Sequence, residues 1–442
     1  MDNIFISILL LPVILVLLSA AFIKPKYLII LPILSYKIVY EVIIFFNLTI
    51  QNSVASQTAL RISALCAGVC CLIVIFYFLI NKISLYNRYL FPFFIFINLF
   101  GLFNGFYRNN DLVYNIGDFF NLFQIYIFTL LLLLLFEKGF KYNLIYSFLL
   151  FSFVADLFYF FQYANMLIDG PFLRIMGGNV FLALLSFYLI YTKEKRFNSI
   201  YSISFIISFL TILMAGYRGK WLLFVLGIIL IIVMSQKKLS FTNILRKVAS
   251  SAMLVFFIFT ILYQIPTFKE YFNKRVIEET IMAYKYDGDT ESESQKSYEV
   301  FKILQYFNNN PSSLLLGFGS GAEIEIDKNV GNYILKKWDS RGTLHYIHNT
   351  YFSILFRYGI IGLLFFLYFI FKLCRIGFDK NKSKDKIDKF ALVYLLICII
   401  GFTQDFMIGV YLGILEWPFI FAMIINYKKN ISTKIEKNVQ TV

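Results

Sequence analysis

The chain has 442 residues, of which 59% are hydrophobic, 20% are aromatic and only 15% are charged. This composition excludes a soluble globular protein and is typical of a protein that crosses a membrane many times. The net charge of +15 would suggest nucleic-acid binding in a soluble protein. Here the basic residues lie in short clusters between apolar runs, so we expect no nucleic acid among the partners.

Apolar runs of the length that a helix needs to cross the hydrocarbon core, about 20 residues, recur from one end of the chain to the other. The sequence therefore predicts an all-α polytopic integral membrane protein with about 12 to 13 transmembrane helices. The first run has no basic region before it, so we expect a retained span rather than a cleaved signal peptide. The predicted spans are 3–22, 27–48, 61–80, 89–106, 115–136, 143–165, 175–192, 199–216, 219–234, 248–265, 349–372, 390–409 and 411–427.

Lysine and arginine clusters occupy every second loop between these spans, which is the distribution expected of cytoplasmic loops. The pattern predicts a cytoplasmic C-terminus and an extracytoplasmic position for the one long polar interruption. It divides the chain into membrane helices (1–265), a large extracytoplasmic loop (266–348), the last membrane helices (349–427) and a basic cytoplasmic tail (428–442). The clusters lie at 24–26, 82–88, 138–141, 193–196, 237–247, 372–389 and 428–437.

The long loop is predicted to contain two amphipathic helices. The first begins at Pro266, and a hydrophilic break, DGDTESESQK, separates it from the second, SYEVFKILQYFNNNP. In the second helix the apolar face is expected at Val300, Ile303, Leu304 and Phe307. The following LLLGFGSGAE is interpreted as a plain turn, because a phosphate-binding loop requires a preceding strand and a Lys-Ser/Thr pair that are missing here.

Few ionisable side chains lie inside the predicted spans or at their ends, and most of them lie toward the outer side of the membrane. Each costs roughly 2.5 to 3.5 kcal/mol at a helix centre, so each is expected to face a partner or a water-filled cavity. With the predicted topology the eight residues named below fall in the outer half or at the outer boundary of their spans, which suggests a polar cleft open to the outer leaflet. The acidic members either support this cleft or are structural partners of the arginines. The set comprises Asp118, Asp156, Arg174, Arg218, Lys220, Arg357, Asp405 and Glu416. Lys37 and Glu41, one helical turn apart in the span 27–48, are interpreted as a structural pair.

The chain has only two histidines, His345 and His348, and both lie where the long loop returns to the membrane in LHYIHNTYF. A metal site would need three or four ligands at recognisable spacing, so we expect neither a metal nor another cofactor. A general base or a hydrogen-bond donor to an anion is the interpretation that best suits an imidazole at the mouth of a polar cleft. A capping or surface role for one of the two is the alternative.

These features occur in the order found in the bacterial O-antigen polymerase and O-antigen ligase superfamily, which the chain resembles. The similarity covers roughly 170–375: LRIMGGNVFLALLSFYL, a basic motif AGYRGKWLLF, a long loop with NNPSSLLLGFGSG, and HNTYFSILFRYGIIGLLFF leading back into the membrane. The resemblance implies a fold like that of GT-C glycosyltransferases. It also implies a metal-independent, inverting glycosyltransferase of the bacterial cytoplasmic (inner) membrane, with a polyprenyl-diphosphate-linked glycan as donor.

Polymerisation of lipid-linked repeat units of a surface polysaccharide (O-antigen, capsule or exopolysaccharide) is the leading hypothesis. An O-antigen ligase, which transfers the glycan to lipid A core or protein, shares the donor and is the nearest alternative. A transporter or flippase for lipid-linked oligosaccharides is the alternative from another class, although its charges should lie in both halves of the membrane. The implied partners are polyprenyl-diphosphate-linked oligosaccharides, the bilayer, a flippase and a chain-length regulator.

The resemblance assigns roles residue by residue. Arg218 matches the basic residue that binds the diphosphate, and His348 matches the histidine of the motif that returns to the membrane, with His345 as a near neighbour. Lys296 stands where many members have arginine, and a lysine cannot form the bidentate contact of a guanidinium with phosphate. The predicted site is thus His348 and His345 as catalytic groups, a diphosphate-binding set and a supporting acidic set. The diphosphate-binding set is Arg218, Lys220, Arg174, Lys296 and Arg357, and the supporting set is Asp118, Asp156, Asp405 and Glu416.

Overall fold

The computed structural model describes twelve parts of the chain, and they are almost entirely helical, as the all-α prediction requires. The predicted spans 3–22 and 27–48, most of 248–265 and the tail 428–442 lie outside the described residues. The described parts are 68–169, 180–192, 198–215, 218–235, 260–261, 263–273, 291–325, 343–345, 347, 349–380, 386–401 and 417–426.

The elements follow the predicted order closely. Those before the long loop are the apolar helix Gly68–Ile80, η3 (Pro92–Ile97), α5 (Asn98–Tyr107), α6 (Leu112–Glu137), α7 (Lys141–Asp169), α8 (Val180–Tyr191), α9 (Asn198–Ala215) and α10 (Arg218–Met234). Those in and after it are α12 (Pro266–Phe272), α14 (Glu291–Asn309), α15 (Ser313–Leu316), β1 (Ile324–Glu325), β2 (Thr343–Leu344), α17 (Thr350–Lys380), α18 (Lys386–Gly401) and the helix Trp417–Asn426.

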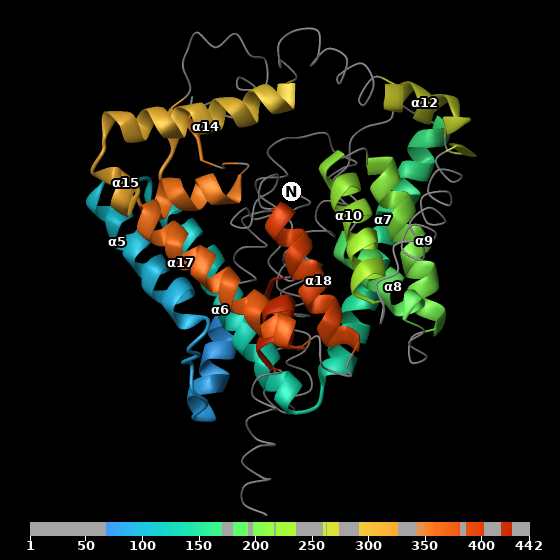
Figure 1. Ribbon diagram of the computed structural model, residues 1–442, viewed down its shortest axis with the longest axis horizontal. Coiled ribbons are helices and arrows are strands. Elements are labelled where there is room, and N and C mark those ends of the chain that lie inside the picture. Colours follow the sequence, from blue (N-terminus) through green and yellow to red (C-terminus); the bar gives the residue numbers. More distant parts are fainter. Residues whose placement is uncertain are drawn as a thin grey trace, which may run out of the picture.

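Two of the described helices are long and apolar enough to cross a membrane by length and composition, Leu112–Glu137 and Thr350–Phe378. Six shorter apolar helices accompany them, which fits a helical membrane protein. In Figure 1, α12, α14 and α15 lie across one end of the molecule, and the turn between α6 and α7 lies at the other end. We call these the loop end and the turn end.

The largest apolar core joins helices from both halves of the chain. Phe181 of α8 contacts Phe390 and Tyr394 of α18, and Phe94 of η3 contacts Phe369 of α17 and Phe421 of the last described helix. Such edge-to-face aromatic contacts fill space between helices that have few small residues. The membrane helices on the two sides of the long loop therefore share one core rather than forming separate bundles.

α17 is broken at Gly359, whose φ of 67° and ψ of −169° are not helical. Its first turns lie beneath α14 at a steep angle to the rest of the helix, as Figure 1 shows. The predicted span 349–372 corresponds to the candidate span Thr350–Phe378, but the helix is interrupted at Gly359 rather than continuous. The cause is a glycine in the left-handed region of φ, which only a residue without a Cβ adopts at low cost.

The second loop helix also differs from its prediction. α14 begins at Glu291, inside the stretch predicted to be a hydrophilic break. Ile303 and Phe307 are buried as expected, but Leu304 is 53% exposed. The buried face is thus narrower than the apolar pattern suggested.

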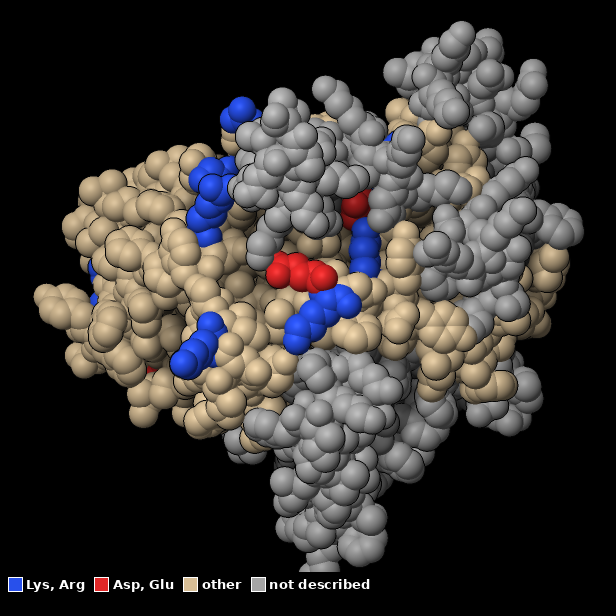
Figure 2. All heavy atoms as spheres, turned by 90° about the horizontal axis from the view of Figure 1, so that it is seen from below, with Lys and Arg blue, Asp and Glu red and all other residues tan. Residues whose placement is uncertain are grey.

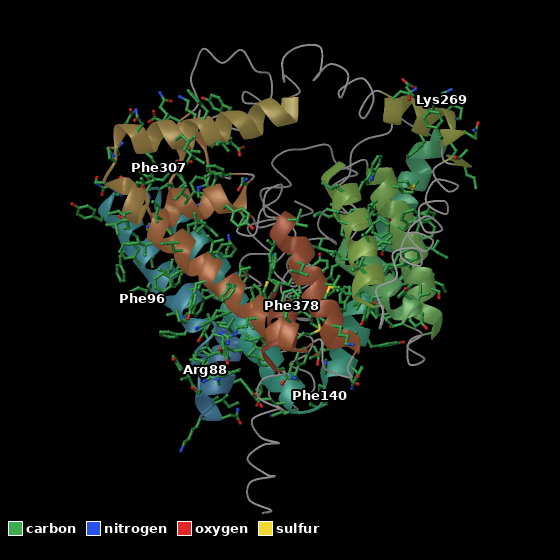
Figure 3. The ribbon with its side chains drawn as sticks, viewed as in Figure 1. Arg88, Phe96, Phe140, Lys269, Phe307 and Phe378 are labelled. Carbon is green, nitrogen blue, oxygen red and sulfur yellow. The ribbon has the colours of Figure 1, made fainter. Side chains whose placement is uncertain are left out.

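A small second core holds the loop helices to α17. Phe307 of α14 and Phe318 of the glycine-rich turn pack against Phe356 of α17 with tilted or edge-to-face rings, and Figure 3 shows Phe307 on the lower side of α14. Ile324 and Leu344, which pair between β1 and β2, complete this core. The loop is therefore packed onto the membrane helices along 303–324.

Basic side chains are scattered over the turn end. Figure 2, which shows the molecule from below, has separate lysines and arginines on the described part of this face, with fewer acidic side chains beside them. Figure 3 places Arg88 at the lower edge and Lys269 of α12 at the opposite end. At the turn end Lys141 of α7 forms an ion pair of 2.6 Å with Asp388 of α18.

Candidate functional site

Asp118 is placed by the first two turns of α6. Asp111 caps this helix, because its side chain accepts hydrogen bonds from the backbone N–H groups of Val113 (2.9 Å) and Tyr114 (3.2 Å). Two turns later Asp118 is only 1% exposed, and Gln124 is buried too. Both polar side chains therefore point into the protein.

Arg357 of α17 is the cationic partner of Asp118. Its Nε lies 2.7 Å from Asp118 Oδ2, and both side chains are 2% exposed. Its Nη1 donates to Ser353 Oγ one turn earlier in α17. A buried charge is tolerated in a membrane protein when a counter-charge and hydrogen bonds replace the lost water, and this pair meets that condition.

His345 joins the same carboxylate from the loop side. Its Nε2 lies 3.2 Å from Asp118 Oδ1, and its backbone carbonyl accepts a hydrogen bond of 2.7 Å from Arg357 Nη2. The imidazole is stacked on Tyr114, with ring centroids 4.1 Å apart and planes at 14°. We refer to Asp118, His345, Ser353 and Arg357 as the Asp118 cluster.

The glycine-rich turn supplies the last contact of this cluster. The backbone N–H of Gly321 donates to Asp118 Oδ2 at 2.8 Å. The turn is also held by α17, since Phe318 N–H donates to Phe356 O (2.8 Å) and Gly319 N–H to Arg357 O (2.9 Å). The turn therefore couples the loop to the carboxylate of α6 and to the backbone beside Arg357.

Glycine is required in this turn because the chains approach closely. Gly319 and Gly321 have φ of +85° and +75°, and a Cβ on either would lie under 3.0 Å from backbone atoms of α5 or α6. In α5, Gly101 and Gly105 are spaced four apart, and a Cβ there would meet Tyr358 or Ser320. Small residues at this spacing allow close backbone packing in membranes. The sequence interpretation of a plain turn missed this docking role.

Three polar side chains, from α5 and the turn after it, form hydrogen bonds with α15 and the glycine-rich turn. Asn104 donates to Gly317 O at 3.2 Å, and Asn110 donates to the carbonyls of Phe318 (2.9 Å) and Ser320 (2.8 Å). Arg108 donates to Ser313 Oγ at 2.9 Å. Asn104 escaped prediction although it lies inside the predicted span 89–106, and Arg108 and Asn110 escaped it because they look like ordinary loop residues.

Tyr306 connects α14 with the hairpin above the cluster. Its hydroxyl accepts a hydrogen bond of 3.0 Å from the backbone N–H of Glu325, and its ring packs edge-on against Phe318 and Phe356. Burial raises the pKa of the Tyr306 hydroxyl above its ordinary value. This tyrosine is therefore a neutral part of the second core.

Residues 203–367 match the O-antigen ligase family. This match covers less than half of the 442 residues, and we call the matched region the O-antigen ligase domain. The resemblance to the O-antigen polymerase and O-antigen ligase superfamily is confirmed. No curated protein matches the chain. The O-antigen ligase domain contains α10, the described loop elements, His345 and Arg357, whereas Asp118 lies before it in α6.

The family match also indicates the general activity. Members of this superfamily transfer glycans, and the match supports O-antigen polymerase or ligase activity in general. It implies substrates that are lipid-linked glycans and a place in a membrane. The residues of the O-antigen ligase domain that the structure brings together are thus candidates for the transfer site.

Two further predicted residues lie in helices that contribute no residue to the Asp118 cluster. Asp156 of α7 is buried and accepts a hydrogen bond from Ser208 Oγ of α9, which lies in the O-antigen ligase domain. Lys220 is partly buried in the first turn of α10. Their roles as cleft support and diphosphate ligand stay predictions.

The remaining predicted residues are not placed. Arg174, His348, Asp405 and Glu416 lie outside the described residues, and only the backbone is described for Arg218, at the start of α10, and Lys296, in α14. In the described ranges no three or more histidine, cysteine, aspartate or glutamate side chains form a group that could hold a metal ion. Metal independence stays a prediction.

Ser353, Tyr114 and the Gly321 N–H are site contacts that the sequence reasoning missed. Ser353 precedes Arg357 by four residues, which is the spacing of neighbours on one helix face and was a usable signal. Tyr114 and Gly321 carry no such signal, because their contacts with His345 and Asp118 arise only when α6 and the loop pack together.

Proposed function

We propose that the protein polymerises lipid-linked repeat units, by transferring a growing glycan from its polyprenyl diphosphate carrier to the next unit. The observation that carries this proposal is the O-antigen ligase domain at 203–367, which contains the loop, His345 and Arg357. The junction of loop and membrane helices suits substrates whose lipid tails stay in the bilayer while their sugars meet outside it.

The proposed reaction is a single inverting displacement. A histidine takes the proton of the acceptor hydroxyl, the oxygen attacks the anomeric carbon, and the bond from this carbon to the diphosphate oxygen breaks on the opposite face. The diphosphate leaves with its negative charge, so the protein must stabilise that charge rather than create a leaving group. No metal and no cofactor are needed in this scheme.

We assign the base to His348, which precedes Asn349 in the matched motif. Asn349 is the N-cap of α17, since its Oδ1 accepts a hydrogen bond of 3.2 Å from Phe352 N–H. The diphosphate is proposed to meet Arg218, with Lys220, Arg174 and Lys296 as further cations. Replacing Arg218 or His348 by alanine is expected to abolish polymer at normal membrane levels of the protein.

Arg357 has a different proposed role from the diphosphate binding first expected of it. Its side chain is 2% exposed and contacts Asp118, Ser353 and the carbonyl of His345. A guanidinium with three such partners would have to give up contacts to reach a phosphate. We therefore propose that it supports the site and does not bind the leaving group.

An extension assay tests the proposed function directly. Purified protein is mixed with a synthetic polyprenyl-diphosphate-linked repeat unit in the presence of a metal chelator and without ATP. A ladder of longer lipid-linked glycans is the expected result, and it would also exclude the transporter alternative as the only activity. Absence of any product, with added Mg²⁺ or without it, would contradict the proposal.

An O-antigen ligase is the second candidate, because the matched family is described as O-antigen ligase. The acceptor would then be lipid A core or a protein instead of another lipid-linked unit. Deletion of the gene distinguishes the two functions. Short glycans of one repeat indicate a polymerase, whereas full-length glycans that remain unattached indicate a ligase.

We propose a bacterial cytoplasmic membrane location with the loop end outside and the turn end in the cytoplasm. Support comes from the basic side chains at the turn end in Figure 2, because cytoplasmic surfaces carry the excess of lysine and arginine. A cysteine introduced within 285–295 should react with an impermeant reagent on intact cells. Reaction only after lysis would mean the opposite orientation. A flippase and a chain-length regulator remain proposed partners.

A further inference from the structure

His345 is held at two different points by two different helices. Its imidazole contacts Asp118 of α6, and its carbonyl oxygen accepts a hydrogen bond from Arg357 of α17. The residue before it, Leu344, is paired with Ile324 in the hairpin, and Ile347 is 1% exposed in the second core. We call residues 344–349 the return segment; it leads from the hairpin to the N-cap of α17.

We infer that Asp118 and Arg357 are positioning residues for the return segment, and that they act through His345. The inference rests on the proposed function, because it is this segment that contains the proposed base. It also makes α6, which precedes the O-antigen ligase domain, a part of the transfer site.

The ring of His345 is restrained in orientation as well as in place. Stacking on Tyr114 sets the plane of the imidazole, and the contact with Asp118 sets its rotation within that plane. A carboxylate offers only acceptor oxygens, so Nε2 carries a hydrogen and donates it to Asp118. In a neutral ring the basic nitrogen is then Nδ1.

The chemistry of the cluster also favours positioning over stability. Two apolar side chains would fill the same buried space at no electrostatic cost, and buried ion pairs often contribute little net stability. Here the pair additionally binds the imidazole, the carbonyl of His345 and the N–H of Gly321. A directional charged pair is what fixes a polar segment at defined atoms.

The position of Arg357 depends on the glycine-rich turn, because the turn contacts α17 next to the break at Gly359. Arg357 lies two residues before this break in α17, and its carbonyl accepts a hydrogen bond from Gly319 N–H of the glycine-rich turn. A shift of the turn would therefore move the backbone that carries the guanidinium. Both partners of the ion pair contact the same turn, since Gly321 N–H donates to Asp118 and Gly319 N–H donates to the carbonyl of Arg357.

The test compares Asp118→Asn, Arg357→Gln and the double variant in the purified full-length protein. Each single change leaves one buried charged group without its counter-charge, so we expect a lower unfolding temperature. The double variant replaces the ion pair by two neutral amides, and we expect its unfolding temperature to return close to that of the wild type.

In the double variant the rate of glycan transfer should stay low even though the unfolding temperature recovers. In the double variant kcat is expected to stay about 100-fold below the wild-type value, the loss typical of a reacting group misplaced by about 1 Å. The KM for the synthetic lipid-linked unit should stay within about threefold, because the proposed diphosphate ligands are unchanged. Asp388→Asn, which breaks the ion pair at the turn end, is the matched control and should leave kcat unchanged.

Recovery of both stability and kcat in the double variant would overturn the inference. If the double variant does not fold, Asp118→Asn is combined with His345→Gln instead. No further loss of kcat beyond that of His345→Gln supports action through His345, and an additive loss overturns it. A wild-type protein without transfer activity would instead overturn the proposed function itself.

Discussion

Two ion pairs link distant parts of the chain at opposite ends of the molecule, and they differ in burial. Asp118 and Arg357 at the loop end are both 2% exposed, whereas Lys141 and Asp388 at the turn end are 12% and 11% exposed. The distances are nearly equal, 2.7 Å and 2.6 Å. Distance alone therefore says little about what each pair does.

The difference in burial decides how much stability the protein loses when one partner of each pair is removed. Where some water still reaches the charges it screens them and solvates a partner left alone, so such a pair contributes less than one from which water is excluded. Where water is excluded, loss of one partner leaves a charge with nothing to replace its solvation. We therefore expect changes at the loop end to be severe and matched changes at the turn end to be mild.

The largest effect is expected from Asp118→Ala, which leaves the guanidinium of Arg357 buried without a counter-charge. The free energy of unfolding should fall by about 4 kcal/mol. Thermal unfolding of the detergent-purified protein and its level in membranes measure this loss. A fall comparable to that of Asp388→Asn would contradict the view that burial separates the two pairs.

The next largest loss of stability tests the docking of the glycine-rich turn, with a glycine of nearly the same φ elsewhere in the chain as the control. Gly319→Ala adds a Cβ against the backbone of α5 at a φ of +85°, so the loss should be about 3 kcal/mol. Gly139, at the turn end, has a φ of +87°, and a Cβ added there would have nothing within 4 Å.

Gly139→Ala should therefore cost only the strain of a left-handed residue, about 1 kcal/mol. The pair of variants is compared by thermal unfolding under identical conditions. Equal losses would mean that close packing of the turn on α5 contributes nothing beyond backbone strain.

A smaller loss of stability is expected in the second core, where two adjacent residues of α14 serve as variant and control. Ile303 is fully buried, and Ile303→Ala should cost about 2 to 3 kcal/mol. Leu304 is 53% exposed, and Leu304→Ala should change stability by less than about 0.5 kcal/mol. Limited proteolysis of the loop and thermal unfolding measure both; a larger loss from Leu304→Ala would mean that this face of α14 is covered.

The smallest effect of a charge change is expected from Asp388→Asn at the turn end. Loss of the pair with Lys141 should cost about 1 kcal/mol or less, since both side chains keep some contact with solvent. The same measurement in high salt should reduce the difference from wild type further. A salt-independent loss of several kcal/mol would show that this pair behaves as a buried one.

The order of helices was predictable because it depends on local properties. Continuous apolar runs, basic residues between them and caps such as Asp111 are readable from a few residues at a time. Predicted spans such as 115–136 and 219–234 correspond closely to α6 (Leu112–Glu137) and α10 (Arg218–Met234). The break at Gly359 was missed because a glycine between apolar residues does not disturb hydropathy.

The candidate site was predictable only as a set of residue types. A charge inside an apolar span implies a partner, which made Asp118, Arg357 and His345 candidates from the sequence. Which of them meet was not predictable, since Asp118 and His345 are 227 residues apart. Their pairing depends on how α6, the loop and α17 pack.

The sequence by itself determined that the chain is a helical membrane protein and which polar groups needed partners, because hydrophobicity and charge are properties of single residues. Only the tertiary structure decided that one carboxylate of α6 binds both the guanidinium of α17 and the imidazole of the return segment. The physical reason is that burial of a charge is set by the atoms packed around it. Those atoms come from distant parts of the chain.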